Sequence, residues 1–148
     1  MSGIYLDVKA SLLAFCKRSK QAVGRDDMEV FDFDTHAAQN KLPGVDLIGV
    51  GDYSLTDEQE THIGSCSVAV CTLSDDTLLG RLSTMIDYLY SQLSPGTQIP
   101  VVKRDNGQHV GFITVTTPMT VLPVVATETR PLQEIMVSFA VALETPPR

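Results

Sequence analysis

The sequence has 148 residues, of which 43% are hydrophobic and 20% are charged, and its formal net charge is −7. These values are ordinary for a globular chain and exclude a collagen-like repeat or a disordered composition. A chain of this length folds around one core, so we expect one domain over residues 1–148, and its acidic excess predicts no specific nucleic-acid binding.

The chain opens with a helical pattern and continues with a strand pattern. Apolar residues at three- and four-residue spacing predict an amphipathic helix over residues 3–21, which Gly24 ends. A short strand is predicted over Glu29–Phe33. The polar stretch that follows closes with Leu42-Pro43-Gly44, which is typical of a turn.

The next segment is rich in β-forming residues but is interrupted by charges. Val45–Val50 predicts a second short strand, and residues 51–61, which are acidic and polar, predict an exposed loop or hairpin arm. Residues 62–73 then predict a long strand.

A second helix has the clearest periodicity in the sequence. Ser74 is a suitable N-cap, and Asp75 and Asp76 would then lie in the first turn, at the positive end of the helix dipole. Ser94-Pro95-Gly96 ends the pattern. The apolar positions at helical spacing are Leu78, Leu82, Met85, Ile86, Leu89 and Leu93.

Strand patterns dominate the last third of the chain. Residues 99–103 and 110–117 flank an Asp-Asn-Gly turn and predict a hairpin. Two prolines confine residues 118–126 to an edge or an irregular extended segment, because proline cannot donate to a strand ladder. Residues 135–143 alternate between apolar and other residues, as in a strand with one buried face.

The order of these elements, with short connections, favours antiparallel pairing. We therefore expect an α+β fold with one twisted, mainly antiparallel sheet packed against two helices. No apolar run is long enough to cross a membrane, and no secretory signal is recognisable at the N-terminus, so we expect the chain to fold in a cytoplasm and to have no membrane partner.

Cysteine and histidine do not form a recognisable site in the sequence. The three cysteines are not closely spaced, and we expect free, mostly buried thiols. The three histidines lie in separate polar segments without metal-ligand spacing, so we expect no metal and no cofactor. These residues are Cys16, Cys66, Cys71, His36, His62 and His109.

One short motif points to a different chemistry. Asp32 and Asp34, followed by Thr35, match the Asp-x-Asp-x-Thr string of haloacid-dehalogenase-type phosphatases, where the carboxylates attack phosphorus and help to hold magnesium. Lys103 could bind the phosphate, and the adjacent pair Asp75-Asp76 could supply the distant metal ligands. The context argues against this function, because no hydrophobic strand precedes the motif and no βαβ unit follows it closely.

A glycine pair also invites a binding hypothesis. Gly49-Val50-Gly51 has two of the glycines of a dinucleotide-binding loop, but it lacks the third glycine and the helix that must follow. We therefore assign it to strand structure.

Four segments together resemble a known family: the opening helix over residues 4–20, the central strand over 63–73, the helix over 76–93 and the closing strand over 135–143. In order and size they are similar to the tail terminator proteins of long-tailed bacteriophages. The resemblance implies a structural virion protein, not an enzyme, that forms a hexameric ring. Such a ring caps the tail tube, joins it to the head-side connector, and would lie in the neck of the virion with DNA passing through.

The exposed segments suggest surfaces for such an assembly. A ring needs edges and loops that a neighbouring subunit can cover, and the proline-interrupted stretch 118–126 and the acidic arm 51–61 are suitable. We hypothesise that Asp57, Glu58 and Glu60 face the ring lumen or a neighbour, because an acidic lumen repels DNA. Simple solvation of these charges explains them equally well.

Three alternatives remain open from the sequence. The chain could be another neck or tail-completion protein, a magnesium-dependent phosphatase built on Asp32 and Asp34, or a small binding module whose acidic surface meets a basic protein.

Overall fold

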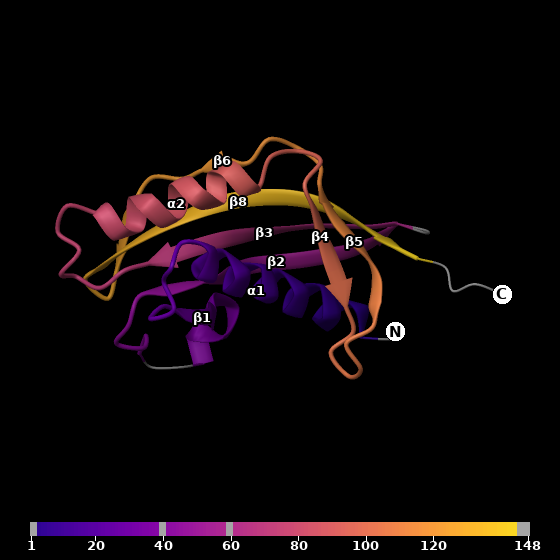
Figure 1. Ribbon diagram of the computed structural model, residues 1–148, viewed down its shortest axis with the longest axis horizontal. Helices are drawn as coiled ribbons and strands as arrows, with labels where there is room; N and C mark the ends of the chain where they lie inside the picture. The colour runs from indigo at the N-terminus through magenta and orange to yellow at the C-terminus, as the bar shows by residue number, and fades with distance from the viewer. Residues whose placement is uncertain (1–2, 39–40, 59–60, 145–148) are drawn as a thin grey trace.

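The computed structural model describes residues 3–38, 41–58 and 61–144, apart from the side chains of residues 36–38 and 57–58. Within those residues the chain forms two α-helices, one 3₁₀ helix and eight strands (Figure 1). The helices are α1 (Ile4–Ala22), η1 (Phe33–Ala38) and α2 (Gly80–Gln92). The strands are β1 (Glu29–Asp32), β2 (Leu47–Glu58), β3 (Thr61–Cys71), β4 (Gln98–Val102), β5 (His109–Val115), β6 (Thr120–Val121), β7 (Val125–Thr127) and β8 (Arg130–Leu143).

All the strands belong to one sheet. The order is β1-β2-β3-β8-β5-β4, and the short strands β6 and β7 also pair with β8. Every pair is antiparallel except β1 with β2. This architecture confirms the predicted α+β class, with a mainly antiparallel sheet and two helices.

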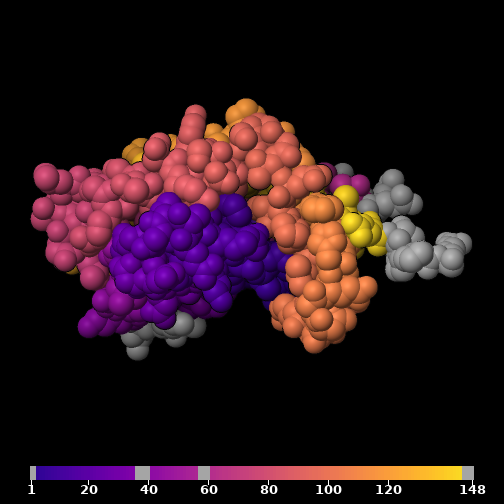
Figure 2. All heavy atoms as spheres, viewed as in Figure 1, coloured from indigo at the N-terminus to yellow at the C-terminus, as the bar shows by residue number. Residues whose placement is uncertain are grey.

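Both helices lie on the same face of the sheet, and the main core is between the two layers (Figure 1). On β8 the core residues alternate along the strand, as the sequence predicted: Ile135, Val137, Phe139 and Val141 are all buried. Figure 2 shows this covered face, with α1 in indigo between α2 and the β4–β5 hairpin, which is drawn in orange. The helical layer therefore extends from β1 to the β4 edge.

The first helix agrees closely with its prediction. Its apolar stripe, which includes Val8, Leu12 and Cys16, is buried against the sheet. Gly24 follows the helix with a φ of 75°, a left-handed conformation that glycine adopts without steric cost, so it ends the helix as expected. No helix in the described part of the chain combines the length and the apolar character needed to cross a membrane.

The predicted end of a strand at Val50 is wrong, whereas the alternative that residues 51–61 form a hairpin arm is confirmed for the part up to Glu58. One strand, β2, runs through both segments and pairs with β3 along its whole length. A β-bulge between Gly51 and Ser54 shifts the register, and Asp52 within it has a φ of 48°. The bulge breaks the period-two pattern, so the continuous strand reads in sequence as a strand followed by a loop.

The start of the second helix was also predicted too early. The helix begins at Gly80, and Ser74 does not cap it. The Asp76 carboxylate instead accepts hydrogen bonds from the backbone N–H groups of Arg81 and Leu82, at 3.1 and 3.0 Å. Leu79 precedes the helix with a φ of 56°, so the backbone cannot continue the helix backwards through it.

The C-terminal predictions are confirmed. β4 and β5 form the expected hairpin, although each begins one residue earlier than predicted. The stretch 118–126 contains only β6 and the start of β7, both of which pair with β8 alone among the described strands. It is therefore an edge of the sheet.

Candidate functional site

The side of the sheet that faces away from both helices carries a continuous surface, which we call the open face. Strand register places its residues side by side across four strands, because directly paired residues point to the same side of a sheet. The open face consists of Ser54 and Thr56 on β2, Ile63 and Ser65 on β3, Phe112 and Thr114 on β5, and Met136, Ser138, Ala140 and Ala142 on β8.

The ten residues of the open face are uncharged, although the chain as a whole carries a net charge of −7, and the partly exposed Glu134, which pairs with Ala69 on the same side of the sheet, borders them on β8. All ten residues are at least partly exposed, and Ile63 and Met136 expose 46% and 38% of their surface. Ser54 and Ser65 form a hydrogen bond across β2 and β3, with their hydroxyl oxygens 3.2 Å apart. A broad exposed surface with apolar side chains and no charge is typical of a protein contact site.

Besides β1, the described sheet has free edges at β4 and at β6 and β7, and these two edges differ in how their backbone groups are satisfied. At β4, α1 closes the edge: the Ser11 hydroxyl accepts a hydrogen bond from the N–H of Val102 at 3.1 Å. Just beyond β4, the Asp7 carboxylate accepts the N–H of Arg104 at 3.2 Å and its side-chain Nε at 3.0 Å. These contacts explain why α1 buries Asp7 and Ser11. They block strand addition at β4.

The edge at β6 and β7 has no such helix contact among the described hydrogen bonds. Val124 and Val125 expose 40% and 52% of their surface there. Exposed apolar residues on a sheet edge favour pairing with another chain. The prediction that residues 118–126 form an accessible edge is therefore confirmed, while the partner that would use it stays a prediction.

A buried carboxylate organises the opposite end of the sheet, where α2 begins. Asp46 exposes 4% of its surface and accepts hydrogen bonds from Arg25 at 2.6 Å, from Arg81 at 2.8 Å and from the backbone N–H of Leu73 at 2.8 Å. Burial alone would raise the pKa of Asp46, but the hydrogen bonds donated by Arg81 and Arg25 outweigh it and lower that pKa. The carboxylate therefore stays charged and connects the end of α1 to the start of α2.

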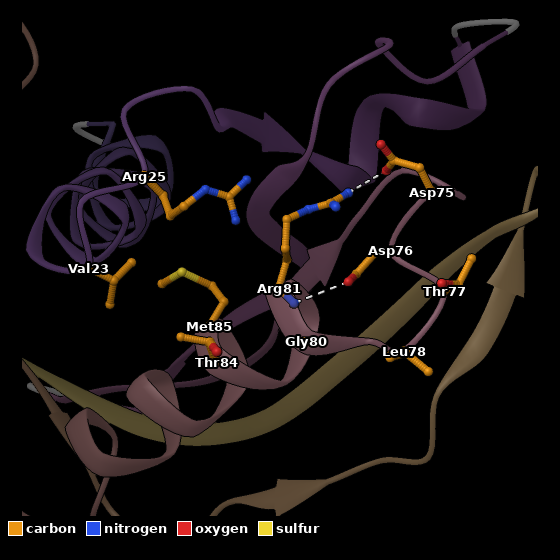
Figure 3. A pocket seen from close by; sticks show the side chains of 10 residues that line it. All are labelled: Val23, Arg25, Asp75, Asp76, Thr77, Leu78, Gly80, Arg81, Thr84 and Met85. Atoms are coloured by element: carbon orange, nitrogen blue, oxygen red, sulfur yellow. Dashed lines mark hydrogen bonds and ion pairs between the residues drawn. The ribbon is translucent and has the colours of Figure 1, made fainter.

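A groove of about 660 Å³ lies beside this network, between the end of α1 and the first turns of α2 (Figure 3). Its arginines do not make it an anion site, because their guanidinium groups are already paired. Arg81 contacts Asp75 at 2.6 Å as well as Asp46, and Arg25 contacts both oxygens of Asp27 at 2.8 Å. The groove lining is Val23, Arg25, Asp75, Asp76, Thr77, Leu78, Gly80, Arg81, Thr84 and Met85.

Asp32 and Asp34, the two carboxylates of the phosphatase-like string, lie close together where β1 meets η1. Lys9 on α1 contacts both, at 2.9 Å and 3.4 Å. Asp34 also accepts the backbone N–H groups of Asp52 and Tyr53, at 2.7 and 3.3 Å. Asp34 thus satisfies two backbone N–H groups in the bulge of β2, which gives the motif a structural role.

Thr35 has a local role as well, because its hydroxyl donates a hydrogen bond to the carbonyl oxygen of Asp32 at 2.9 Å. Lys103 lies after β4, and Asp75 and Asp76 precede α2. Within the described ranges, no three or more histidine, cysteine, aspartate or glutamate side chains are grouped so that they could hold a metal ion.

The cysteines are free and buried, as predicted. Burial raises the pKa of Cys66 to about 12 and raises the pKa of Cys16 and Cys71 as well. All three thiols therefore stay protonated at neutral pH, where a thiol is a weak nucleophile. His109 is partly exposed and packs edge-on against the Phe112 ring, with 4.7 Å between ring centroids.

The predicted acidic interaction residues lie at the β2–β3 turn. Asp57 and Glu58 are the last residues of β2, where they pair with His62 and Thr61 of β3. Their side chains, and the whole of Glu60, lie outside the described residues. The hypothesis that they face a lumen or a neighbour stays a prediction.

Comparison with known proteins gives a fold but no family. No family model matches the sequence, and no curated protein sequence matches it. A solved structure whose name states no function matches with a TM-score of 0.54 over 96% of each chain, at 11% identity. At that identity the similarity shows the fold alone.

Sequence reasoning did not single out the open face. The signal was present in β8, where Met136, Ser138, Ala140 and Ala142 alternate with the core residues and carry no charge. Only the register with β3 and β5 shows that their neighbours are uncharged too.

Proposed function

We propose that the chain is a structural subunit of the tail-terminator type, which forms a ring, caps a phage tail tube and joins it to the head-side connector. The observation that carries this proposal is the open face. An enzyme gathers reactive groups in a concave site, whereas the ten residues of this broad surface are uncharged and only Glu134 borders them.

A ring requires two different surfaces on each subunit. Head-to-tail contacts join unlike patches, and they close into a ring when the rotation between neighbours permits. The open face and the exposed edge at Val124 and Val125 are two such patches. The first would pack against a neighbour, and the second would offer backbone groups for pairing.

Charge favours the open face as the place where copies meet. Two subunits that each carry a net charge of −7 repel each other, and the repulsion is strongest where acidic side chains approach. Contacts made by the ten residues of the open face bring no like charges together, and Glu134 lies at their border. The hexameric stoichiometry and a lumen lined by Asp57, Glu58 and Glu60 follow from the family resemblance and belong to the same proposal.

Light scattering across a concentration series tests the assembly, with the purified chain alone and mixed with the tail tube protein of the same virus. We expect a closed assembly of fixed mass, either alone or at tube ends. A chain that stays monomeric at all concentrations and does not bind the tube would overturn the proposal.

A single charge tests the surface itself. Ser138→Asp introduces a carboxylate in the middle of the open face, and we expect it to abolish ring formation while the thermal unfolding curve stays near that of the original chain. Ser91→Asp is the control, because it makes the same change at an exposed position on α2. Equal ring formation by both variants would show that the open face is not the contact.

The lumen hypothesis has its own test, reversal of the three acidic charges at the hairpin turn by Asp57→Lys, Glu58→Lys and Glu60→Lys together. We expect altered tail length or reduced DNA passage if the charges face the lumen or a neighbour. Unchanged ring assembly and tail length would leave them as solvated surface charges.

A further inference from the structure

The exposed side of α1 differs in charge from the rest of this acidic chain. Asp7 is the only acidic residue in the helix, and its side chain is buried beside Arg104. Lys17 and Arg18 are exposed near the C-terminal end of the helix, and neither forms an ion pair within the described residues. The helix therefore presents two unpaired cations and no carboxylate to the outside.

The remainder of that side of α1 is apolar. Leu6 exposes 46% of its surface, Ala14 is exposed, and Ala10 and Leu13 are partly exposed. Intervals of three and four residues align these side chains with Lys17 along one line of the helix, which we call the α1 stripe. Figure 2 shows α1 uncovered in the middle of the helical layer. The stripe thus runs from an apolar end at Leu6 to a basic end at Lys17.

The open face has the opposite charge at one of its ends. A pocket of about 160 Å³ borders it there, and three carboxylates line this acidic pocket, those of Asp34, Asp52 and Glu134. Lys9 pairs with Asp34, but no cation among the described residues pairs with Asp52 or Glu134. The open face therefore runs along β8 from an acidic end at Glu134 to an uncharged end at Ala142.

The two surfaces also match in length. A helix rises 1.5 Å per residue, so Leu6 and Lys17 lie about 17 Å apart along α1. A strand rises about 3.3 Å per residue, so Glu134 and Ala140 lie about 20 Å apart along β8. The difference is smaller than the length of a lysine side chain. When Lys17 contacts Glu134, Leu6 therefore lies opposite Ala140, in the uncharged part of the open face.

These complementary surfaces lie on opposite sides of the molecule, because both helices cover one face of the sheet and the open face is the other (Figure 1). One chain cannot join its own two surfaces, whereas a head-to-tail contact between copies can. We propose that the open face receives α1 of a neighbouring copy, with Lys17 and Arg18 of that copy beside the acidic pocket. This inference rests on the proposed ring, and it names the surface of the neighbour that packs on the open face.

The charges outside the two surfaces agree with this orientation. The next carboxylates after α1, those of Asp26 and Asp27, lie beyond the turn at Gly24, and Asp27 is paired with Arg25. Glu144 follows β8 at the far end of the open face, where the N-terminal end of the neighbouring α1, the positive end of its dipole, would approach. Two copies that each carry a net charge of −7 thus meet where opposite charges face each other.

Charge reversal with rescue tests the contact, and light scattering measures the assembly. We expect Lys17→Glu combined with Arg18→Glu to weaken ring association at least about tenfold, because two attractions become repulsions. Addition of Glu134→Lys should recover most of the lost association, which a merely structural role of the cations would not explain. Lys103→Glu is the matched control, since Lys103 is also exposed but lies between β4 and β5, and its association should equal that of the original chain.

A cross-link locates the contact without relying on affinity. Ala10→Cys and Ser138→Cys are combined in one chain, and the sheet separates the two positions within each copy. We expect mild oxidation to give a ladder of covalent oligomers up to the closed ring, while each single variant gives none, because a head-to-tail contact joins unlike positions. Ser91→Cys combined with Ser138→Cys should give no ladder, and the native cysteines do not compete because they are buried.

The outcomes separate this inference from the proposed function. If rings form and depend on Ser138 but tolerate the reversed charges on α1 or give no ladder, the α1 contact is wrong and the ring stands. If the α1 variants lose binding to the tail tube protein while the ring persists, α1 contacts the tube and the inference is also overturned. A chain that forms no assembly at all overturns both proposals.

Discussion

The two faces of the sheet carry different kinds of side chain, although the same strands form both faces. On β8, Val137, Phe139 and Val141 point toward the helices and are buried, with exposures of 4%, 0% and 0%. Their neighbours Ser138 and Ala140 point to the open face. The covered face is filled with large apolar side chains, and the open face with small or uncharged ones.

This difference separates two kinds of constraint. The fold itself explains the covered face, because tight packing against α1 and α2 selects size and shape. The open face packs against no described element over most of its area, so a contact outside the chain is the simplest reason for its lack of charge. Substitutions on each face test whether the two constraints differ.

The largest effect is expected on the covered face. Phe139→Ala removes a fully buried ring at the centre of β8 and should lower the free energy of unfolding by about 4 kcal/mol, through lost burial and a residual cavity. Met136→Ala, on the same strand but on the open face, should cost less than about 1 kcal/mol. Urea titrations of both variants measure the difference, and equal losses would contradict the contrast between the faces.

A smaller effect is expected at the polar end of the helical layer. Asp46→Ala leaves Arg25 and Arg81 without their shared buried carboxylate and should cost about 3 kcal/mol in the same titration. Asp27→Ala removes another partner of Arg25, but an exposed one, and should cost less than about 1 kcal/mol. Similar losses would show that solvent stabilises Arg25 and Arg81 as well as the buried Asp46 carboxylate does.

At the β1 end of the sheet, the absence of a side chain at Gly49 allows β1 to lie close to β2. An added Cβ at Gly49 would lie 1.6 Å from the carbonyl oxygen of Phe31, so Gly49→Ala must displace β1 and should cost about 2 kcal/mol. Gly44→Ala is the control, since its Cβ would meet no atom within 4 Å. Thermal unfolding compares the two. A tolerated Gly49→Ala would show that β1 moves freely relative to β2.

Acid should have the smallest effect. The pKa values of Asp46 and Asp76 are lower in the folded chain than the ordinary value near 4, so the folded state binds fewer protons in that range. Their contribution to stability is present above about pH 4 and is lost as the pH falls through their folded pKa values. Chemical denaturation from pH 6 to pH 3 measures this loss. Asp46→Ala should lose less stability than the original chain over the same range, and an equal loss would exclude Asp46 as a source.

The elements with a regular local pattern were predictable. The stripe of α1 and the alternation along β8 follow from residue spacing alone, because a helix and a strand each impose a fixed period on the side chains that face a core. Gly24 and the prolines around residues 118–126 act on the backbone directly, so their consequences were also visible in the sequence.

The errors occur where a distant residue determines the local structure. Asp34 accepts the N–H groups of Asp52 and Tyr53 and stabilises the bulge that hides the length of β2. Asp46 and Asp76 fix the loop that carries Leu78 and delay the start of α2. No period in the sequence encodes these contacts, because each joins groups on different elements.

The class of fold, the positions of most elements and the buried state of the cysteines follow from residue order alone, since backbone periodicity and hydrophobic burial act through neighbouring residues. Tertiary structure alone decided which uncharged residues share the open face, which edge α1 closes through Ser11 and Asp7, and that the α1 stripe lies on the side of the molecule opposite to the open face. Those features depend on strand register and on charged contacts between elements distant in the chain, and both arise only once the chain has folded.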